Sequence, residues 1–516
     1  MSKTAIAAPP QANAPLTGGM LWAAAIILAA ANFIAVLDMT IANVSVPNIS
    51  GALGAATSQG TWVITSYAVA EAITVPLTGW LAARFGAVRV FVFAMALFGL
   101  FSALCGMSTS LGMLVVARIC QGFAGGPLMP LSQILLLRIF PKEKAPAAMG
   151  LWAMTTLIAP ILGPILGGYL CDEISWPWIF YINVPIASAC AFIAWRMLKR
   201  YELALLKNPI DRVGLILLIV WVGSLQLLLD EGKNLDWFSS PEIVVLAIVA
   251  VLGFAVFLIW ELHEEHPIVD LRVFRHRGFS VSVLTISLAF AAFFGTNVLT
   301  PQWLQSFMGY TAISAGTATA WSGVFAILVA PIAAALSNKV DSRKLVFVGV
   351  LWLGLTTLLR AVATTNMSYW DVSIPIMLMG LGMPFFFVPS TTLALASVDQ
   401  HETASAAGLM NFLRTLSGAF ATSLITTQWD DQITQNHAEL VGLADSDQSM
   451  QTLFESFGMT TDAVVRSLDR LINDQAVMLA TNQIMVAVGF VFVIAASVIW
   501  LAPKPTRTVE PGAGGH

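Results

Sequence analysis

The sequence predicts an all-α membrane protein that crosses the bilayer many times, and three observations support this prediction. Only 10% of the 516 residues are charged and 57% are hydrophobic, whereas soluble domains carry about 25% charged residues. The hydrophobic residues fall into long runs, and a spanning helix needs roughly 20 of them. Basic residues gather on alternate connections between these runs. Such a chain cannot cover a globular surface with polar groups, so we expect a bilayer around it.

Fourteen apolar runs are expected to span the membrane. Residues 1–19 form a polar tail, and the run after them is followed by many others, so we expect a retained first helix rather than a cleaved signal peptide. An N-terminal bundle, 20–200, contains runs at 20–46, 61–82, 88–106, 111–139, 147–170 and 178–195. Two central helices with their flanking loops occupy 201–275, with runs at 213–229 and 243–262. A C-terminal bundle, 276–502, contains runs at 279–303, 314–336, 344–363, 372–398, 403–428 and 476–501, and is followed by a tail at 503–516.

The distribution of Lys and Arg predicts the orientation of these helices. With the N-terminus on the cytoplasmic side, 19 of the 25 basic residues fall in cytoplasmic loops and tails, and four fall outside. Cytoplasmic loops carry an excess of Lys and Arg. An even number of helices returns the chain to the same side, so both termini are expected to be cytoplasmic.

One external loop, 429–475, is long and polar but has apolar residues at helical spacing, such as Leu468, Leu471 and Ile472. We expect short amphipathic helices in it. It is either a solvated cap or a docking surface for an extracytoplasmic partner.

The two bundles echo one another in sequence. Pro130 precedes Gly150 by 20 residues and Pro389 precedes Gly408 by 19, eight predicted helices further on. A twofold repeat of six helices with two helices inserted between the halves explains this spacing. Chance similarity between Gly- and Pro-rich helices is the alternative. Secondary transporters are built from such repeats, with the substrate site between the halves near the midplane.

Four ionisable residues lie within the predicted spans: Asp38, Glu71, Arg118 and Arg414. Ionisable groups in a membrane usually face a cavity or a partner. At 1.5 Å per residue, the first three lie about 13, 15 and 10 Å below the outer surface, and therefore at similar depth. Burial favours the neutral form of a carboxyl group and a nearby Arg favours the charged form, so a change in water access could make Asp38 take or release a proton. The alternatives are a static ion pair for Asp38 and Arg118, and substrate contact for Glu71.

Other classes of site are not indicated. The four cysteines form no C-x-x-C pair and are interpreted as small apolar fillers. All six histidines lie in predicted loops or tails, and none is spaced as a metal ligand beside a buried carboxylate. There is no P-loop, and the net charge of −4 gives no reason to expect nucleic acid. We therefore expect no metal site, no catalytic residues and no cofactor. A non-transporting membrane sensor or scaffold is a remote alternative.

Several motifs resemble those of one family. Residues 37–44, LDMTIANV, look like the first-helix signature of the fourteen-helix drug:proton antiporters of the major facilitator superfamily, and 118–122, RICQG, resemble the superfamily's fourth-helix motif. Residues 79–86, 163–168 and 178–185 resemble its loop motif, its antiporter motif and the start of its sixth helix. Residues 58–65, 236–240 and the long external loop are most similar to the EmrB-type subgroup.

The resemblance implies a bacterial inner-membrane protein with the major facilitator fold. It implies export of hydrophobic or amphipathic compounds in exchange for protons, together with a periplasmic adaptor of EmrA type and an outer-membrane duct of TolC type. Proton coupling is expected at Asp38 and Arg118, with Glu71 as a further candidate. The expected gating residues are Gly79, Arg84, Gly86, Gly163, Pro164, Gly167 and Gly168. Candidate contacts in the substrate cavity are Thr40, Asn43, Gln133, Trp152, Asn297, Asn411 and Arg414.

Two positions depart from the family pattern. Ala83 stands where the loop motif usually has an Asp that ties the halves together on the inner side, and Glu71 is an acid not expected in this subgroup. Glu71 could change the proton stoichiometry or favour cationic substrates. Export of one physiological amphipath, such as a fatty acid, bile acid or siderophore, is the alternative within transport.

Overall fold

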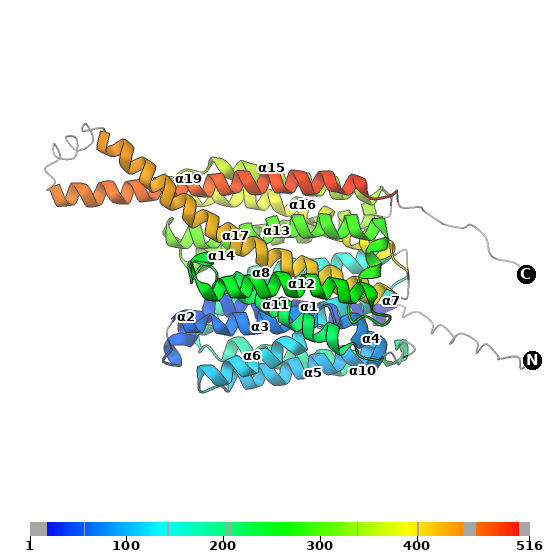
Figure 1. Cartoon of the computed structure of the whole chain (residues 1–516). Coiled ribbons are helices and arrows are strands. Elements are labelled where there is room, and N and C mark those ends of the chain that lie inside the picture. Colours follow the sequence, from blue (N-terminus) through cyan, green and yellow to red (C-terminus); the bar gives the residue numbers. More distant parts are fainter. Residues whose placement is uncertain are drawn as a thin grey trace, which may run out of the picture.

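The computed structural model describes residues 18–55, 57–141, 144–202, 205, 209–337, 339–399, 402–446 and 461–504. Within these residues all regular structure is helical. The helices run roughly side by side in one elongated bundle (Figure 1).

The N-terminal half contains the first six predicted spans. They correspond to α1 (Gly18–Ala52), α3 with α4 (Trp62–Thr74, Thr78–Phe85), α5 (Ala87–Gly106), α6 with α7 (Leu111–Gly125, Leu128–Ile139), α8 (Ala145–Glu173) and α9 with α10 (Trp178–Tyr181, Asn183–Leu198). A short helix, α2 (Thr57–Gly60), follows α1.

The central pair and the C-terminal half follow in the expected order. The central pair is α11 (Arg212–Glu231) and α12 (Pro241–His263). The C-terminal half consists of α13 (Arg277–Ser306), α14 (Ala312–Ser337), α15 (Ser342–Leu359), α16 (Tyr369–Ala396), α17 (Thr403–Ser446) and α19 (Thr461–Val498). Short 3₁₀ turns are η2 (Lys199–Tyr201), η3 (Trp237–Ser239), η4 (Leu271–Arg275), η5 (Arg360–Val362) and η6 (Ile499–Leu501).

Prolines cause the breaks within predicted spans. Pro76 separates α3 from α4, and Pro127 separates α6 from α7. Proline lacks the backbone N–H that a helix interior needs, and its ring clashes with the preceding turn. The two breaks lie close together, since a Cβ on Gly126 would meet the Thr74 Cβ at 2.8 Å.

Among the described residues, eleven helices are long and apolar enough to cross a membrane, or twelve if the pair Ala147–Pro160 and Ile165–Cys171, bent by 45°, is one span. The two remaining predicted spans are the broken pair α3 and α4 and the Ser- and Thr-rich first part of α17. The number fourteen is consistent with this helix order and remains a prediction.

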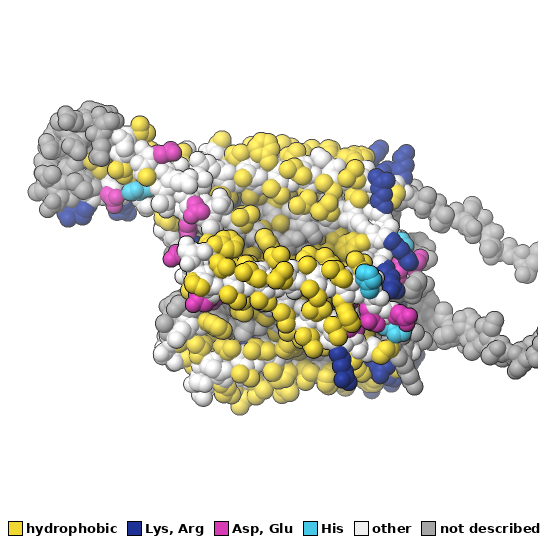
Figure 2. Space-filling model, viewed as in Figure 1, with side chains coloured by type: hydrophobic (Ala, Val, Ile, Leu, Met, Phe, Trp, Pro, Cys, Tyr) yellow, Lys and Arg dark blue, Asp and Glu magenta, His cyan; other side chains and the backbone are white. Residues whose placement is uncertain are grey.

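Charged side chains mark the two ends of the bundle. Hydrophobic side chains cover its middle, and dark blue Lys and Arg gather at the end where α1 begins and α19 finishes (Figure 2). At that end Trp22 packs against Phe140, and Arg343 Nη1 donates to the Ala502 carbonyl. The distribution is consistent with the predicted orientation, in which this end is the cytoplasmic one.

The external loop differs from its prediction. Instead of short separate helices, α17 continues from the bundle to Ser446, and α19 begins at Thr461 before it enters the bundle. The two helices project together from the end opposite the basic one (Figure 1). We call residues 429–446 and 461–475 the helical hairpin. A helix satisfies its backbone hydrogen bonds internally, so it need not stop where the membrane ends. Part of the predicted apolar set lies in residues 447–465, whose side chains are outside the described part.

Hydrogen bonds and an ion pair join the central pair of helices to the C-terminal half on the outer side. Ser423 on α17 donates to the Leu229 carbonyl at 2.8 Å, and Trp237 Nε1 donates to Thr427 Oγ1 at 3.1 Å. Lys233 pairs with Asp430 at 2.5 Å. Helix α12 packs along α11, and most of its apolar side chains are exposed, as expected for a helix that faces lipid.

Candidate functional site

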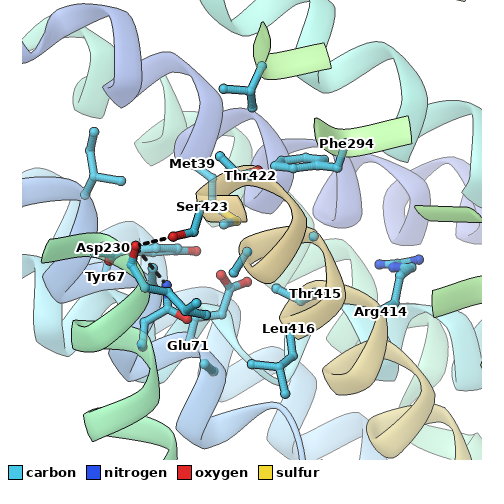
Figure 3. A pocket seen from close by; sticks show the side chains of 18 of the residues that line it. Met39, Tyr67, Glu71, Asp230, Phe294, Arg414, Thr415, Leu416, Thr422 and Ser423 are labelled. Atoms are coloured by element: carbon cyan, nitrogen blue, oxygen red, sulfur yellow. Dashed lines mark hydrogen bonds between the residues drawn. The ribbon is translucent and has the colours of Figure 1, made fainter. Parts of the chain in front are cut away.

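A cavity of about 370 Å³ lies between the two halves. Its walls come from α1, α3 and α8 on one side and α13 and α17 on the other, with α11 between α3 and α17. Aliphatic and aromatic side chains form much of the wall, and polar and charged side chains such as Glu71, Asp230 and Arg414 lie among them (Figure 3). Cavities of roughly 300–1,000 Å³ with such walls are typical of small-molecule sites.

The cavity reaches the outer end of the bundle and is closed toward the inner end. Exposed Lys233 and Asn234, after the outer end of α11, are among its lining residues. Below it the halves touch: a Cβ on Gly79 of α4 would lie 2.8 Å from the Ser405 Cα of α17. Asn411 Nδ2 also donates to Gln133 Oε1 at 2.9 Å, from α17 to α7. With the predicted orientation, the structure is therefore in an outward-facing state.

Asp38 and Arg118 form a buried ion pair beside this cavity. Arg118 Nη1 lies 2.5 Å from Asp38 Oδ2, and both side chains are at most 1% exposed. Arg118 Nε donates to the Val63 carbonyl, and its guanidinium lies 4.2 Å from the centre of the Tyr67 ring. Arg118 is itself a lining residue of the cavity. The two charges that the sequence placed at similar depth are thus in direct contact.

Three further polar residues complete the network around Asp38, and the sequence analysis did not identify them. Asn183 and Gln121 donate to Asp38 Oδ1 at 2.7 and 3.0 Å. Gln121 Oε1 accepts from Arg118 Nη1, and Ser102 Oγ accepts from both amides. Gln121 and Asn183 lie inside the motifs at 118–122 and 178–185. Their position in these motifs was the one feature of the sequence that could have identified them.

Glu71 is close to this network, but no hydrogen bond joins its side chain to the network within the described part of the chain. Its side chain is 4% exposed and lines the cavity, and its Oε2 is buried without a hydrogen-bond partner among the described residues. The close crossing of α3 and α6 positions it, since a Cβ on Gly122 would lie 2.5 Å from the Tyr67 carbonyl oxygen. Glu71 therefore lies in the same region as Asp38 and Arg118, as the similar estimated depths predicted, but outside the hydrogen-bonded group.

Arg414 contributes a second buried guanidinium from α17. It is 2% exposed, lines the cavity, and its Nε has no hydrogen-bond partner among the described residues. The Trp152 and Phe290 rings each lie 5.2 Å from its Cζ, and Nη2 contacts Met129 Sδ. Aromatic faces stabilise a cation that has no carboxylate partner.

The other candidate cavity residues have different positions. Thr40 lines the cavity and hydrogen-bonds to the Ala159 carbonyl. Trp152 is buried behind Arg414 and donates to Ser132 Oγ, whereas Asn297 borders a separate small void with Arg360. The side chain of Asn43 lies outside the described residues. Substrate contact by any of them remains a prediction.

The glycine motifs hold helices close together at two places. A Cβ on Gly163 would lie 2.2 Å from Thr40 Oγ1, so α8 crosses α1 there without a side chain between them. Gly167 is buried, whereas a Cβ on Gly168 would meet nothing within 4 Å. The Pro164 side chain lies outside the described residues.

The inner loop motif is organised around Gly86. Gly86 has a φ of +96°, a conformation that glycine adopts without strain. The Glu202 carboxylate fits against it and accepts from the N–H groups of Val88 and Arg89 at 3.1 and 3.0 Å. Arg84 is half-buried at the end of α4. With Ala83 in place of the family's Asp, the halves meet here through the contact of Gly79 with Ser405.

One expectation about histidines was wrong. His276 Nε2 lies 2.8 Å from Glu402, which is 5% exposed, although 126 residues separate them. These two and Asp399 form a group that could hold a metal ion, but Arg275 Nη2 already donates to Glu402 at 2.7 Å. Burial would raise the pKa of Glu402, but the hydrogen bond to His276 and the charge on Arg275 hold it below its usual value. We interpret the group as an ion-pair cluster at the inner end.

Comparisons with known proteins agree with this geometry. The family model of the Major Facilitator Superfamily matches residues 28–422. The Multidrug export protein EmrB of Haemophilus influenzae is 44% identical over 96% of this chain and 98% of its own length. The Fatty acid resistance protein FarB of Neisseria gonorrhoeae is 41% identical over 97% of this chain and 99% of its own length.

A solved structure shares the fold. The human organic anion transporter MFSD10 (TETRAN) superimposes with a TM-score of 0.54 at 14% identity, covering 92% of this chain and 99% of the other. The chain is thus a multi-pass transporter of a bacterial inner membrane and not an enzyme. It belongs to the major facilitator superfamily and, within it, to the EmrB-type multidrug exporters.

Proposed function

We propose that this protein exports hydrophobic and amphipathic toxic compounds in exchange for protons by alternating access between its two halves. The observation that supports this most strongly is the buried pair of Asp38 and Arg118 at the wall of an outward-facing cavity. Its relatives named as multidrug export proteins support the class of substrate.

The proposed proton step uses only groups at this wall. A proton that enters from the outer side binds Asp38 and removes its negative charge. Arg118 then loses its ion-pair partner in a buried site, which is costly. Rearrangement of the halves to an inward-facing state lets Asp38 release the proton to the cytoplasm and lets Arg118 recover its partner. The substrate leaves the cavity outward before the proton binds.

The test is proton flux in liposomes that contain the purified protein under an imposed pH gradient. Wild-type protein should show flux when hydrophobic dyes or drugs are added, and Asp38→Asn should abolish that flux while the protein remains folded. Substrate-evoked flux that persists in the Asp38→Asn protein would contradict coupling at this site.

A second candidate is export of one physiological amphipath with an acidic headgroup. Buried Arg414, without a carboxylate partner in the described part of the chain, favours it, and so does the likeness to a fatty acid resistance protein. Evoked flux with a single long-chain acid and with none of a panel of drugs would select this candidate.

We also propose that the helical hairpin docks a periplasmic adaptor of EmrA type, which would lead to an outer-membrane duct of TolC type. The projection of the hairpin beyond the outer end of the bundle supports this proposal. A bilayer surrounds the rest of the molecule.

A further inference from the structure

The cavity contains two acidic residues that the proposed coupling pair does not use. Glu71 on α3 and Asp230 on α11 both line it, and they lie together with Tyr67 in one part of the cavity (Figure 3). The Asp230 carboxylate has some of its hydrogen bonds, since it accepts one from Gln226 Nε2 at 3.2 Å and one from Thr65. Glu71 retains a buried oxygen without a partner. A buried carboxyl group in this condition is unstable as a free anion.

Two of the three basic residues that line the cavity are already paired with other acids. Arg118 is paired with Asp38 at 2.5 Å, and Lys233 at the mouth is paired with Asp430 at 2.5 Å. Arg414 stands apart from the acidic group in Figure 3, against the rings of Trp152 and Phe290. The charge of Arg414 still acts on Glu71. Glu71 and Asp230 are therefore two acids against one cation without a carboxylate partner, which leaves this part of the cavity with an excess of negative charge.

The other walls of the same cavity suit a bulky organic group. Phe290, Phe293, Phe294 and Phe412 line the cavity on the α13 and α17 side, and Met39 and Ile64 line it on the other side. Aromatic faces attract cations, and the volume of about 370 Å³ admits a drug-sized molecule. Negative charge and aromatic walls together select a ligand that is both apolar and positively charged.

We infer that Glu71 is a binding subsite for lipophilic organic cations, with Asp230 attracting the same ligands nearer the mouth. The inference deepens the proposed function by naming a substrate class for its cavity. The cation would place its charged centre against Glu71 Oε2 and its apolar groups against the phenylalanines.

Proton and ligand then exclude one another at Glu71. The buried carboxyl group is stable when it carries a proton or when a cation lies against it, and not otherwise. The charged and titratable groups that face it are Asp38, Tyr67, Arg118 and Arg414, besides Asp230. Of these, Asp38 and Arg118 neutralise one another. Acidification should therefore weaken binding of the cation.

The experiment uses the full chain in nanodiscs and two probes of nearly the same shape and opposite charge, tetraphenylphosphonium and tetraphenylborate. Empty nanodiscs correct for partition into lipid. Wild-type protein should bind the phosphonium more tightly at pH 8 than at pH 6. Glu71→Gln, which keeps the shape of the side chain, should weaken phosphonium binding about tenfold, as expected for loss of about 1.4 kcal/mol, and should remove the pH dependence. Glu71→Asp should retain part of the binding.

Two controls separate the outcomes. Glu173→Gln removes an exposed acid at the end of α8 and should bind like the wild type. Proton flux evoked by an uncharged dye in liposomes reports the proposed function independently, so its absence in wild-type protein overturns that function and not the subsite. Unchanged phosphonium binding in Glu71→Gln, or wild-type preference for tetraphenylborate, would overturn the inference.

Discussion

Asp38 is stabilised by Arg118, Asn183 and Gln121, which approach it from two other helices. The three donors are not equivalent. Each amide contributes one neutral donor, whereas Arg118 contributes the compensating charge. Loss of an amide weakens a hydrogen bond, but loss of Arg118 strands a buried anion.

Arg118→Ala should therefore destabilise the folded protein by about 3–5 kcal/mol, the range for breaking one side of a buried pair. It should also abolish substrate-evoked proton flux. The double substitution Asp38→Asn with Arg118→Met removes both charges and should recover much of the stability without recovering flux. Thermal unfolding of the purified proteins measures their stability, and the liposome assay measures their proton flux.

Lys233→Ala is the matched control, because the two side chains of its pair with Asp430 are 38% and 45% exposed and exposed pairs contribute about 0–1 kcal/mol. A double variant no more stable than Arg118→Ala would show that packing, and not charge, stabilises this site.

The sequence predicted the charged part of this site and not the neutral part. A charge inside a membrane span is rare enough to identify by itself, and helix geometry then gave the common depth of Asp38 and Arg118. Gln121 and Asn183 are ordinary residues at helix interfaces, so only the folded structure selects them. The contact of His276 with Glu402 joins two distant loops, and spacing along the chain contains no information about it.

The crossing of α1 and α8 depends on one glycine of the antiporter motif. Gly163 allows Thr40 Oγ1 and the Ile41 backbone nitrogen to lie within 2.2 and 3.0 Å of where its Cβ would be. Neither position can move far, since one belongs to the backbone of α1 and the other hydrogen-bonds to the Ala159 carbonyl.

Gly163→Ala should thus separate α1 from α8, lower stability by about 1–3 kcal/mol through overpacking, and reduce transport. Gly168→Ala lies in the same motif but has open space at its Cβ, and alanine favours helix by about 1 kcal/mol over glycine, so this variant should be at least as stable as the wild type. Thermal unfolding and dye-evoked proton flux measure both. Equal effects of the two substitutions would contradict the close-packing argument.

The order and type of the helices followed from hydropathy, but their ends did not. Prolines at 76 and 127 interrupt two predicted spans, while α16 continues through Pro375, Pro384 and Pro389. Neighbouring helices decide which proline breaks a helix and which one only bends it. The extension of α17 to Ser446 was not predicted, because hydropathy reports where a helix leaves the membrane and not where it stops being helical.

At the scale of the whole molecule, an outward-facing cavity and a projecting hairpin lie at the same end. Deletion of residues 445–469 removes the end of the hairpin and leaves the cavity residues intact. We expect this protein to retain substrate-evoked proton flux in liposomes but to lose resistance to toxic compounds in cells, because the adaptor would have no docking surface.

The check is the comparison of both measurements at equal amounts of protein in the membrane. A serine-rich linker of equal length in place of 445–469 controls for the shortened connection. Normal cellular resistance in either protein would count against docking by the hairpin and in favour of a solvated cap.

The continuity of α17 has a mechanical consequence. This single helix carries Ser405 at the inner closure, Arg414 in the cavity and Ser446 in the hairpin, and its 44 residues span about 66 Å. The outer tip lies about 48 Å from Arg414 along the helix, so a tilt of about 10° there would displace it by about 8 Å. Any rocking of the C-terminal half therefore becomes a movement of several ångströms at the tip. A protein bound to the tip would be displaced by this distance in each transport cycle.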